Sequence, residues 1–264
     1  MHPLPRLIVT RPAAEAARWV DELQARGIDA QALPLIEIVP EPFAGPLAAA
    51  REGLHGYDAA MFVSANAAHG FFKEKVPPAP VQKALAAIDT RAWSTGPGTT
   101  RAVLAAGWPP ERLDAPPPDS KQFDSEALWA RVQDQIHPGL RVLIVRGGDA
   151  QGRLAGRHWL AGQLRAAGAV VDQVIAYRRR APVLDAAQRA LAEAASQGGS
   201  RWLFSSSEAV ANLRAALPAQ DWSAAAALAT HPRIAEAARA AGFGRVRDVP
   251  PSLDAVVASI ESGA

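Results

Sequence analysis

The sequence predicts an α/β protein whose chain passes twice through the same series of strands and helices. Short apolar, β-branched runs alternate with helical segments along the 264 residues, and five segments recur later in the same order. Alternation at this spacing is typical of a mostly parallel sheet with helices on both faces. Because the period is far longer than that of a solenoid repeat, we expect two similar domain-sized copies.

The first copy begins with a strand at 6–11, which Pro12 ends. The helix that follows places Ala16, Val20 and Leu23 on one face, and Gly27 ends it. We expect the next strands at 33–39, 59–63 and 92–94. Helices are expected at 47–54, after the turn at 64–66, after the loop at 95–99, and at 125–135.

The second copy begins at Leu140, with a buried strand that leads into a glycine-rich loop ending at Leu154. The matched segments are 7–9 with 143–145, Leu23 and Gly27 with Leu164 and Gly168, 33–36 with 174–177, 62–67 with 204–209, and 95–97 with 230–232. Five matches in one order indicate a duplication. Ligands of open α/β sheets bind at the carboxyl ends of the strands, so we expect a small-molecule site in a cleft between two such edges.

Composition excludes several classes of protein. Hydrophobic residues at 49% and charged residues at 20% are typical of a globular protein, and no apolar run is long enough to cross a membrane. A net charge of +2 is too small to favour nucleic acid, and the six histidines show no metal-ligand spacing. No cysteine is present, and the first residues lack a signal-peptide pattern. We therefore expect a cytoplasmic protein without nucleic-acid or membrane partners.

The glycine-rich loop at 146–153 is consistent with three interpretations. Arg146 and Gly147 could contact an anion, because loop glycines let backbone N–H groups approach a ligand closely. The spacing fits neither of the common nucleotide-binding motifs, and Asp149 would repel a phosphate. An anion-contacting loop, a tight turn without a ligand and a nucleotide site all remain open.

Other strand ends carry hydroxyl, amide and N–H groups suited to a carboxylate. These groups lie at Ser64 and Asn66, at Thr95 and Gly96, at Ser205, Ser206 and Ser207, and at Thr230. Helix capping alone would also explain the serines. Tyr177 ends a predicted strand beside three arginines, where its hydroxyl could donate a proton or a hydrogen bond, or could simply lie at a solvated strand end.

Taken together, these segments resemble the uroporphyrinogen-III synthase family. The resemblance rests on residues 9–12, 62–67, 96–100, 145–147, 152–153, 160, 176–178 and 204–210, and so extends along nearly the whole chain. It implies two flavodoxin-like α/β domains joined by a two-stranded linker. The first domain would combine 1–36 with 178–264, and the second would be 37–177. The linkers would be 33–40 and 172–179, paired with each other.

The resemblance also implies a reaction: cyclisation of the linear tetrapyrrole hydroxymethylbilane, with inversion of its last ring, to uroporphyrinogen III. The protein would need no cofactor or metal to bind this substrate, since hydroxyls, arginines and N–H donors can hold its carboxylates. The family's tyrosine near the linker matches Tyr177, which we expect to contact the leaving hydroxyl. Expected substrate contacts are Arg11, Ser64, Asn66, Thr95, Gly96, Arg146, Gly147, Ser205, Ser206, Ser207 and Thr230.

Two points qualify this expectation. Residues 230–233 depart from the family's usual Gly-Pro-Thr pattern, so hydroxyl contacts from that loop do not follow from the resemblance. Duplicated α/β lobes also occur in non-catalytic proteins that bind a small polyanion, and this is the alternative function. We expect a monomer in either case.

Overall fold

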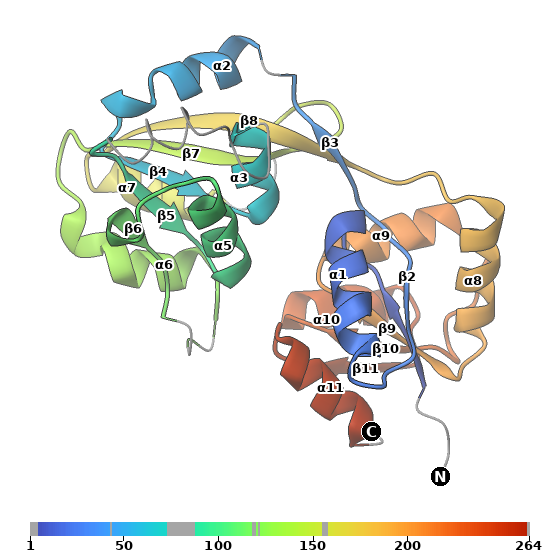
Figure 1. Ribbon diagram of the computed structural model, residues 1–264. Helices are drawn as coiled ribbons and strands as arrows, with labels where there is room; N and C mark the ends of the chain where they lie inside the picture. Colours follow the sequence, from blue (N-terminus) through green and yellow to red (C-terminus); the bar gives the residue numbers. More distant parts are fainter. Residues whose placement is uncertain are drawn as a thin grey trace. The chain divides into compact units, whose positions relative to one another are not determined.

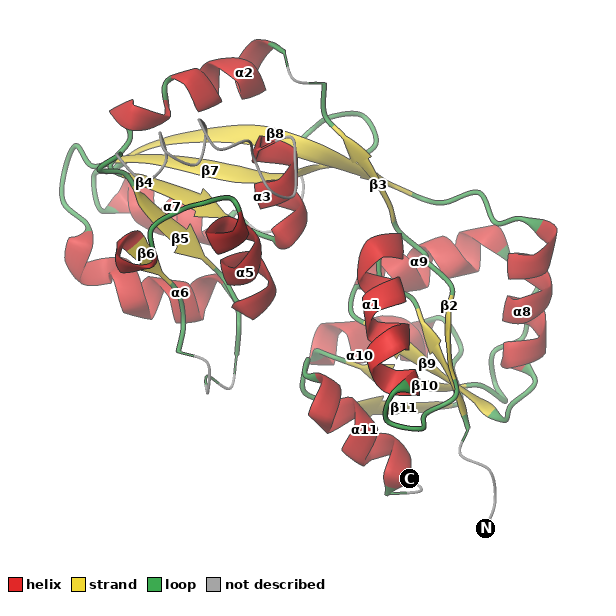
Figure 2. Ribbon diagram, viewed as in Figure 1, coloured by secondary structure: helices red, strands yellow, loops and turns green. Residues whose placement is uncertain are grey.

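The computed structural model describes residues 5–42, 44–72, 88–117, 120, 122–154 and 158–262. The chain divides into two compact units. Unit 1 combines Met1–Glu37 with Arg180–Ala264, and unit 2 is Ile38–Arg179. In each unit a sheet of parallel strands lies between helices, which confirms the predicted α/β class (Figure 2).

Five parallel strands form the sheet of unit 1, in the order β11-β10-β9-β1-β2. Their bounds are Arg6–Val9 (β1), Ala30–Ala32 (β2), Ser200–Phe204 (β9), Ala226–Ala229 (β10) and Arg245–Asp248 (β11). In Figure 1 the blue strand β1 lies beside the orange strand β9, although the two are far apart in sequence. The sheet of unit 1 is thus built from both ends of the chain.

Helices cover both faces of this sheet. Leu7, Leu203 and Leu228 pack on one face against Trp19 and Val256, which belong to the helices α1 and α11. On the other face the indole Nε1 of buried Trp202 donates to a carbonyl of α8 at 3.3 Å. The helix bounds are Ala13–Gln24 (α1), Ala186–Ser196 (α8), Ser207–Ala216 (α9), Pro232–Ala240 (α10) and Leu253–Glu261 (α11).

Six strands form the sheet of unit 2, in the order β3-β8-β7-β4-β5-β6. Their bounds are Glu37–Pro40 (β3), Ala59–Phe62 (β4), Arg91–Ser94 (β5), Leu113–Asp114 (β6), Arg141–Gly148 (β7) and Val170–Arg180 (β8). The five strands from β8 to β6 are parallel. One face packs against α2 (Gly45–Glu52), α3 (Ala65–Phe72) and α5 (Pro97–Ala105). The other face packs against α6 (Ser125–Val132) and α7 (Trp159–Ala166).

Short 3₁₀ turns occur at Leu54–Gly56, Pro110–Arg112 and Gln133–Gln135. They follow α2, precede β6 and extend α6, respectively. The predicted helix at 125–135 therefore tightens in its last turn, as helix ends often do.

The two sheets repeat one strand order. In unit 1, β2-β1-β9-β10-β11 is the 2-1-3-4-5 order of a flavodoxin-like sheet, and β8-β7-β4-β5-β6 repeats it in unit 2. The matched segments of the sequence occupy matched strands, because β1 corresponds to β7 and β4 to β9. Each sheet thus combines the first two strands of one copy with the later strands of the other. The order reverses between β1 and β9 in unit 1, and between β7 and β4 in unit 2.

Three details of the predicted elements are wrong. The strand expected at 33–39 is interrupted: β2 ends at Ala32 and β3 begins at Glu37, although Leu33 and Leu35 still donate to the carbonyls of Val9 and Thr10. Gly147 and Gly148, expected in a loop, belong to β7. The buried face of α1 carries Trp19 in place of Val20, which is half-buried.

Candidate functional site

The predicted site residues gather at the carboxyl ends of strands, within each unit. In unit 2, Ser64 follows β4, Thr95 follows β5, and Gly147 and Tyr177 lie near the ends of β7 and β8. In unit 1, Arg11 follows β1, Ser205 follows β9 and Thr230 follows β10. These edges include the points where the strand order reverses, which is where ligands bind in such sheets.

A hydroxyl pair lies at the reversal point of unit 2. The Ser64 Oγ and Tyr177 Oη atoms are 3.2 Å apart, and either can be the donor. Ser64 Oγ also accepts the Ala67 N–H at 3.1 Å, so this serine caps α3 and is held in place. The Tyr177 side chain is 5% exposed. Its hydroxyl is therefore oriented by a fixed neighbour.

Gly147 makes room for the tyrosine ring. A Cβ atom at this position would lie 2.6 Å from Tyr177 Cζ and 2.8 Å from Tyr177 Oη, closer than real Cβ contacts. Only glycine fits here without a shift of the ring. Gly147 thus allows the Tyr177 ring to take its position, a role that the sequence did not suggest.

A β-bulge turns Tyr177 toward Ser64. The pairing of β7 with β8 shifts between Arg146 and Gly147, so that Ile175 faces Arg146 while Tyr177 faces Gly147. The extra residue Ala176 breaks the alternation of the strand, and Ala176 and Tyr177 both join the same core cluster. Without the bulge, Tyr177 would point to the opposite face of the sheet.

Thr95, Gly96 and Asn66 lie on the same carboxyl edge of unit 2. Thr95 Oγ1 donates to the Val63 carbonyl at 3.2 Å, which ties the loop after β5 to the end of β4. Gly96 is buried against the Phe123 side chain. Asn66 is half-buried in the first turn of α3. The first turns of α3 and α5 therefore lie at this edge with polar side chains beside them.

Arg146 is buried in a polar network. Its side chain is 4% exposed, and Nη1 donates to Gln173 Oε1 at 2.8 Å and lies 3.3 Å from His158 Nδ1. Burial, and then the nearby charge of Arg179, lower the pKa of Arg146. The guanidinium thus links β7 to β8 and to the start of α7. Gln173 and His158 were not singled out from the sequence, since neither belongs to a recognisable motif.

The glycine-rich loop after β7 is closed by its own aspartate. Asp149 Oδ1 accepts the N–H groups of Gln151 and Arg153, each at 2.9 Å, and the Arg153 Nε donates to Asp149 Oδ2 at 2.7 Å. The backbone hydrogen bond from Arg153 is the largest cause that lowers the pKa of Asp149. These donors are therefore used within the loop, which favours the tight turn over an anion cradle at Asp149.

Two of the three arginines that follow Tyr177 form ion pairs with glutamates. Arg178 donates from Nε and Nη2 to the two carboxylate oxygens of Glu41, each at 2.6 Å. Arg180 makes the same two contacts with Glu37, each at 2.7 Å. These forked pairs join β8 to β3 or to the residue that follows β3. The arginines are evident in the sequence, but the glutamates that they pair with could not be predicted from it.

Arg11 lies at the reversal point of unit 1. Its guanidinium carbon is 4.3 Å from the centre of the Trp19 ring, and Nη1 lies 3.3 Å from Glu15 Oε2. The side chain is 14% exposed, and burial lowers the pKa of Arg11 despite the nearby carboxylate. Nε is buried and bonds to no other described residue. Beside it, Thr10 Oγ1 donates to the Leu203 carbonyl at 2.7 Å and ties β1 to β9.

The serine run and the Thr230 loop continue this edge. Ser206 accepts the Glu208 N–H at 3.2 Å and caps α9, and Ser207 Oγ donates to the Arg233 carbonyl at 3.4 Å. His231 caps α10, since its Nδ1 accepts the Arg233 N–H at 3.2 Å. The half-buried hydroxyls of Ser205 and Thr230 make no hydrogen bond to another described residue. Helix capping thus explains Ser206, while the hydroxyls of Ser205 and Thr230 are available to bind a ligand.

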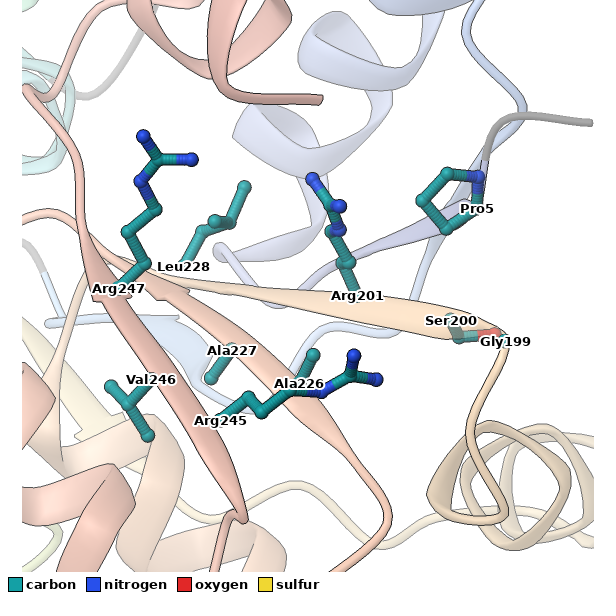
Figure 3. A pocket seen from close by; sticks show the side chains of 10 residues that line it. All are labelled: Pro5, Gly199, Ser200, Arg201, Ala226, Ala227, Leu228, Arg245, Val246 and Arg247. Carbon is teal, nitrogen blue, oxygen red and sulfur yellow. The ribbon is translucent and has the colours of Figure 1, made fainter. Parts of the chain in front are cut away.

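Two hollows in the surface of the described residues lie elsewhere. A pocket of about 280 Å³ lies at the amino ends of β9, β10 and β11 in unit 1, lined by Arg201, Arg245 and Arg247 among others (Figure 3). A second, of about 550 Å³, is lined by residues at the amino ends of β4 and β5 in unit 2. Both lie at the sheet edge opposite to the predicted site residues. The hydroxyl pair and the strand reversals lie at the carboxyl edges, which are therefore the candidate site.

Two further properties concern the part of the chain that the structure describes. It contains no cluster of three or more His, Asp or Glu side chains that could ligate a metal ion. No helix in it has the length and apolar content needed to span a bilayer.

Comparison with known proteins identifies the family. The family model of uroporphyrinogen-III synthase HemD matches residues 17–258. A crystal structure of uroporphyrinogen-III synthetase from Helicobacter pylori matches with a TM-score of 0.62 at 14% identity, covering 99% of this chain and 100% of that one. A mutant uroporphyrinogen III synthase from the extremely thermophilic bacterium Thermus thermophilus matches with a TM-score of 0.55 at 16% identity, covering 98% of each chain. These structures support the two-domain fold, and the family match extends over nearly the whole sequence. The chain therefore belongs to the uroporphyrinogen-III synthase family, whose members are enzymes of haem biosynthesis.

Proposed function

We propose that this enzyme is a cofactor-independent lyase that cyclises hydroxymethylbilane to uroporphyrinogen III, with inversion of the last ring. The observation that carries the proposal is the hydroxyl pair of Ser64 and Tyr177, 3.2 Å apart at the strand reversal of unit 2. Such a pair can deliver a hydrogen bond to a departing hydroxyl. Family membership supplies the substrate to which that chemistry applies.

The reaction begins with breakage of the bond between the terminal CH₂ group and its hydroxyl. The hydroxyl accepts a proton and leaves as water, and the carbon that remains is the cationic end of an azafulvene. The last ring then attacks this cation through its substituted carbon, a spiro intermediate rearranges, and a proton is lost when the macrocycle closes. Tyr177 Oη donates a hydrogen bond to the leaving hydroxyl, and Ser64 holds the tyrosine hydroxyl in place.

Substrate binding depends on the carboxylates of the tetrapyrrole. In unit 1, Arg11 supplies a charge, and Ser205 and Thr230 supply hydroxyls at the carboxyl ends of neighbouring strands. The N-termini of α9 and α10 add backbone N–H groups, and a helix N-terminus favours a negative charge. In unit 2, Asn66, Thr95 and the starts of α3 and α5 contribute in the same way.

Arg146 and Gly147 have different roles in this proposal. Arg146 is buried with Gln173 and His158, so it holds the end of β7 rather than reaching the substrate directly. Gly147 leaves space for the Tyr177 ring. Ser206 and Ser207 begin α9, and there the backbone N–H groups are the binding elements. Substitution of these serines is expected to weaken binding less than loss of the Arg11 charge.

Isomer analysis tests the proposed activity. Purified protein is mixed with freshly prepared hydroxymethylbilane, and the uroporphyrinogen isomers are oxidised and separated by chromatography. Enzymatic closure produces the inverted isomer III at a rate proportional to protein concentration. If only the isomer of spontaneous closure forms, the proposal fails. Tight binding of the bilane without turnover would instead indicate a non-catalytic polyanion-binding protein.

The cellular setting is also a proposal. We infer a monomeric enzyme of the cytoplasm, because the composition and the small molecule that it acts on require neither a membrane nor a second subunit. Sedimentation equilibrium tests the first part, since a mass near 27.8 kDa is expected. Cell fractionation tests the second.

A further inference from the structure

Three arginines on neighbouring strands surround a hollow at the amino edge of unit 1. Arg201 on β9 and Arg245 on β11 both pair in register with Ala226 on β10, so a small residue separates two long cations. Arg247 pairs with Leu228, two residues further along the strands. Figure 3 shows these side chains around the pocket of about 280 Å³. The short side chain of Ala226 leaves the space between them open.

These cations have no carboxylate partner among the described residues. The only hydrogen bond of the Arg201 guanidinium to that part of the chain runs from Nη1 to the Ser259 carbonyl at 2.9 Å. Some other arginines of unit 1 are paired with carboxylates, for example Arg6 with Asp29 at 2.9 Å. A guanidinium has five N–H donors, so most donors of the three arginines lack a protein acceptor.

The three positive charges of the cluster lie close enough to affect one another. Burial, then the charges of Arg245 and Arg247, lower the pKa of Arg201. Like charges that face one pocket repel each other, whereas an oxyanion between them would turn this repulsion into charge-assisted hydrogen bonds. The positive charge around this hollow would therefore favour an anion.

Two simpler explanations account for only part of the cluster. Charged residues on an edge strand prevent pairing with other chains, and β11 is the edge strand of its sheet. That would explain Arg245 and Arg247, but Arg201 lies on β9, two strands in. A cation near the carboxyl end of α11 is favourable as well, but it uses one donor of Arg201. Neither explanation requires three cations around one hollow.

We propose that this pocket, defined by Arg201, Arg245 and Arg247, binds a phosphate dianion, either free or as a monoester. Three guanidinium groups around a small hollow match a compact anion with several acceptor oxygens. The site lies at the opposite end of the strands from Arg11, Ser205 and Thr230. It is therefore independent of the proposed synthase activity.

Calorimetric titration with inorganic phosphate and with phenyl phosphate tests the proposal. The full chain is titrated in chloride buffer at matched ionic strength, and saturable binding of one anion per chain is expected. Arg245→Gln is expected to weaken the affinity by about tenfold or more, since a charge-assisted hydrogen bond is lost. The double variant Arg245→Gln/Arg247→Gln is expected to lose saturable binding. Tighter binding of phenyl phosphate would identify a monoester site, and tighter binding of phosphate a free-ion site.

A matched control separates a built site from general attraction. Arg239→Gln removes one exposed charge of α10 in the same unit and is expected to bind phosphate like the parent. Absence of saturable binding to the parent would overturn the proposal. Equal weakening in Arg239→Gln and Arg245→Gln, or equally tight binding of citrate, would overturn it too. Because Arg245 is exposed on an edge strand, its variant is expected to fold and to retain isomer III production at the parent's rate.

Discussion

Removal of the Tyr177 hydroxyl is the sharpest test of the candidate site. Tyr177→Phe keeps the ring against Gly147 and deletes the one group that lies 3.2 Å from Ser64 Oγ. Ser64 keeps its hydrogen bond from the Ala67 N–H, so no buried acceptor loses all its partners. We therefore expect the free energy of unfolding to fall by only about 1 kcal/mol, the usual contribution of one hydrogen bond.

The expected effect on the reaction is much larger. A positioned proton donor typically contributes about 10²- to 10⁴-fold to the rate, which corresponds to about 3–5 kcal/mol of transition-state stabilisation. Because the hydroxyl acts on the leaving group as the bond breaks, kcat should fall while KM and product affinity change little. Single-turnover formation of isomer III, measured by stopped-flow absorbance and chromatography, gives the rate of this step.

The second tyrosine of the chain provides the control. Tyr57 Oη donates to Asp172 Oδ2 at 2.9 Å, near the amino ends of the strands of unit 2. Tyr57→Phe removes a comparable hydrogen bond and is expected to leave kcat unchanged. Equal rates for Tyr177→Phe and the parent would remove Tyr177 from the mechanism. Equal losses in both variants would show that the effect is one of stability and not of chemistry.

Three further perturbations examine the groups around this tyrosine and the charges of the two edges. Gly147→Ala places a Cβ 2.6 Å from the tyrosine ring, so kcat should fall. The free energy of unfolding of this variant, measured by calorimetry, should be lower by about 1–3 kcal/mol. Arg11→Gln should raise KM about tenfold or more, whereas Arg18→Gln, an exposed control on α1 of the same unit, should not. The Asp149 carboxyl should titrate below its usual 3.8 by NMR. Because the pKa of Asp149 is lowered, the stability that this carboxylate contributes to the loop is present above pH 3.8 and is lost as the pH falls through the lowered pKa.

The fold class and the order of the elements could be predicted because they depend on local patterns. Strands and helices are encoded by runs of apolar residues, and the duplication was visible in ordered matches such as Leu23 and Gly27 with Leu164 and Gly168. The positions of Ser64, Thr95 and Ser205 at strand ends followed from the same patterns. The strand order, with segments exchanged between the copies, depends on long-range pairing that periodicity does not record.

The orientation of individual side chains could not be predicted. Tyr177 points at Ser64 only because a bulge at Ala176 shifts the register of β8, and no residue type signals that bulge. Arg146 was predicted to contact the substrate, and the sequence did not suggest that it lies buried on β7 beside Gln173. The pairing of Arg178 with Glu41 connects residues far apart in sequence. Each of these outcomes depends on a partner strand whose register the sequence pattern leaves open.

The duplication also explains why the two edges differ. Gly147 in unit 2 corresponds to Arg11 in unit 1, and Tyr177 corresponds to Ile36, which is buried. A glycine is needed in unit 2 because a tyrosine ring lies over it, and with no tyrosine at the matching position, unit 1 can carry a long cation there. We infer that the two units have different roles, with the leaving-group contact in unit 2 and a charge that binds carboxylates in unit 1. A loss in kcat for Tyr177→Phe together with a rise in KM for Arg11→Gln would support this division. The opposite pattern would contradict it.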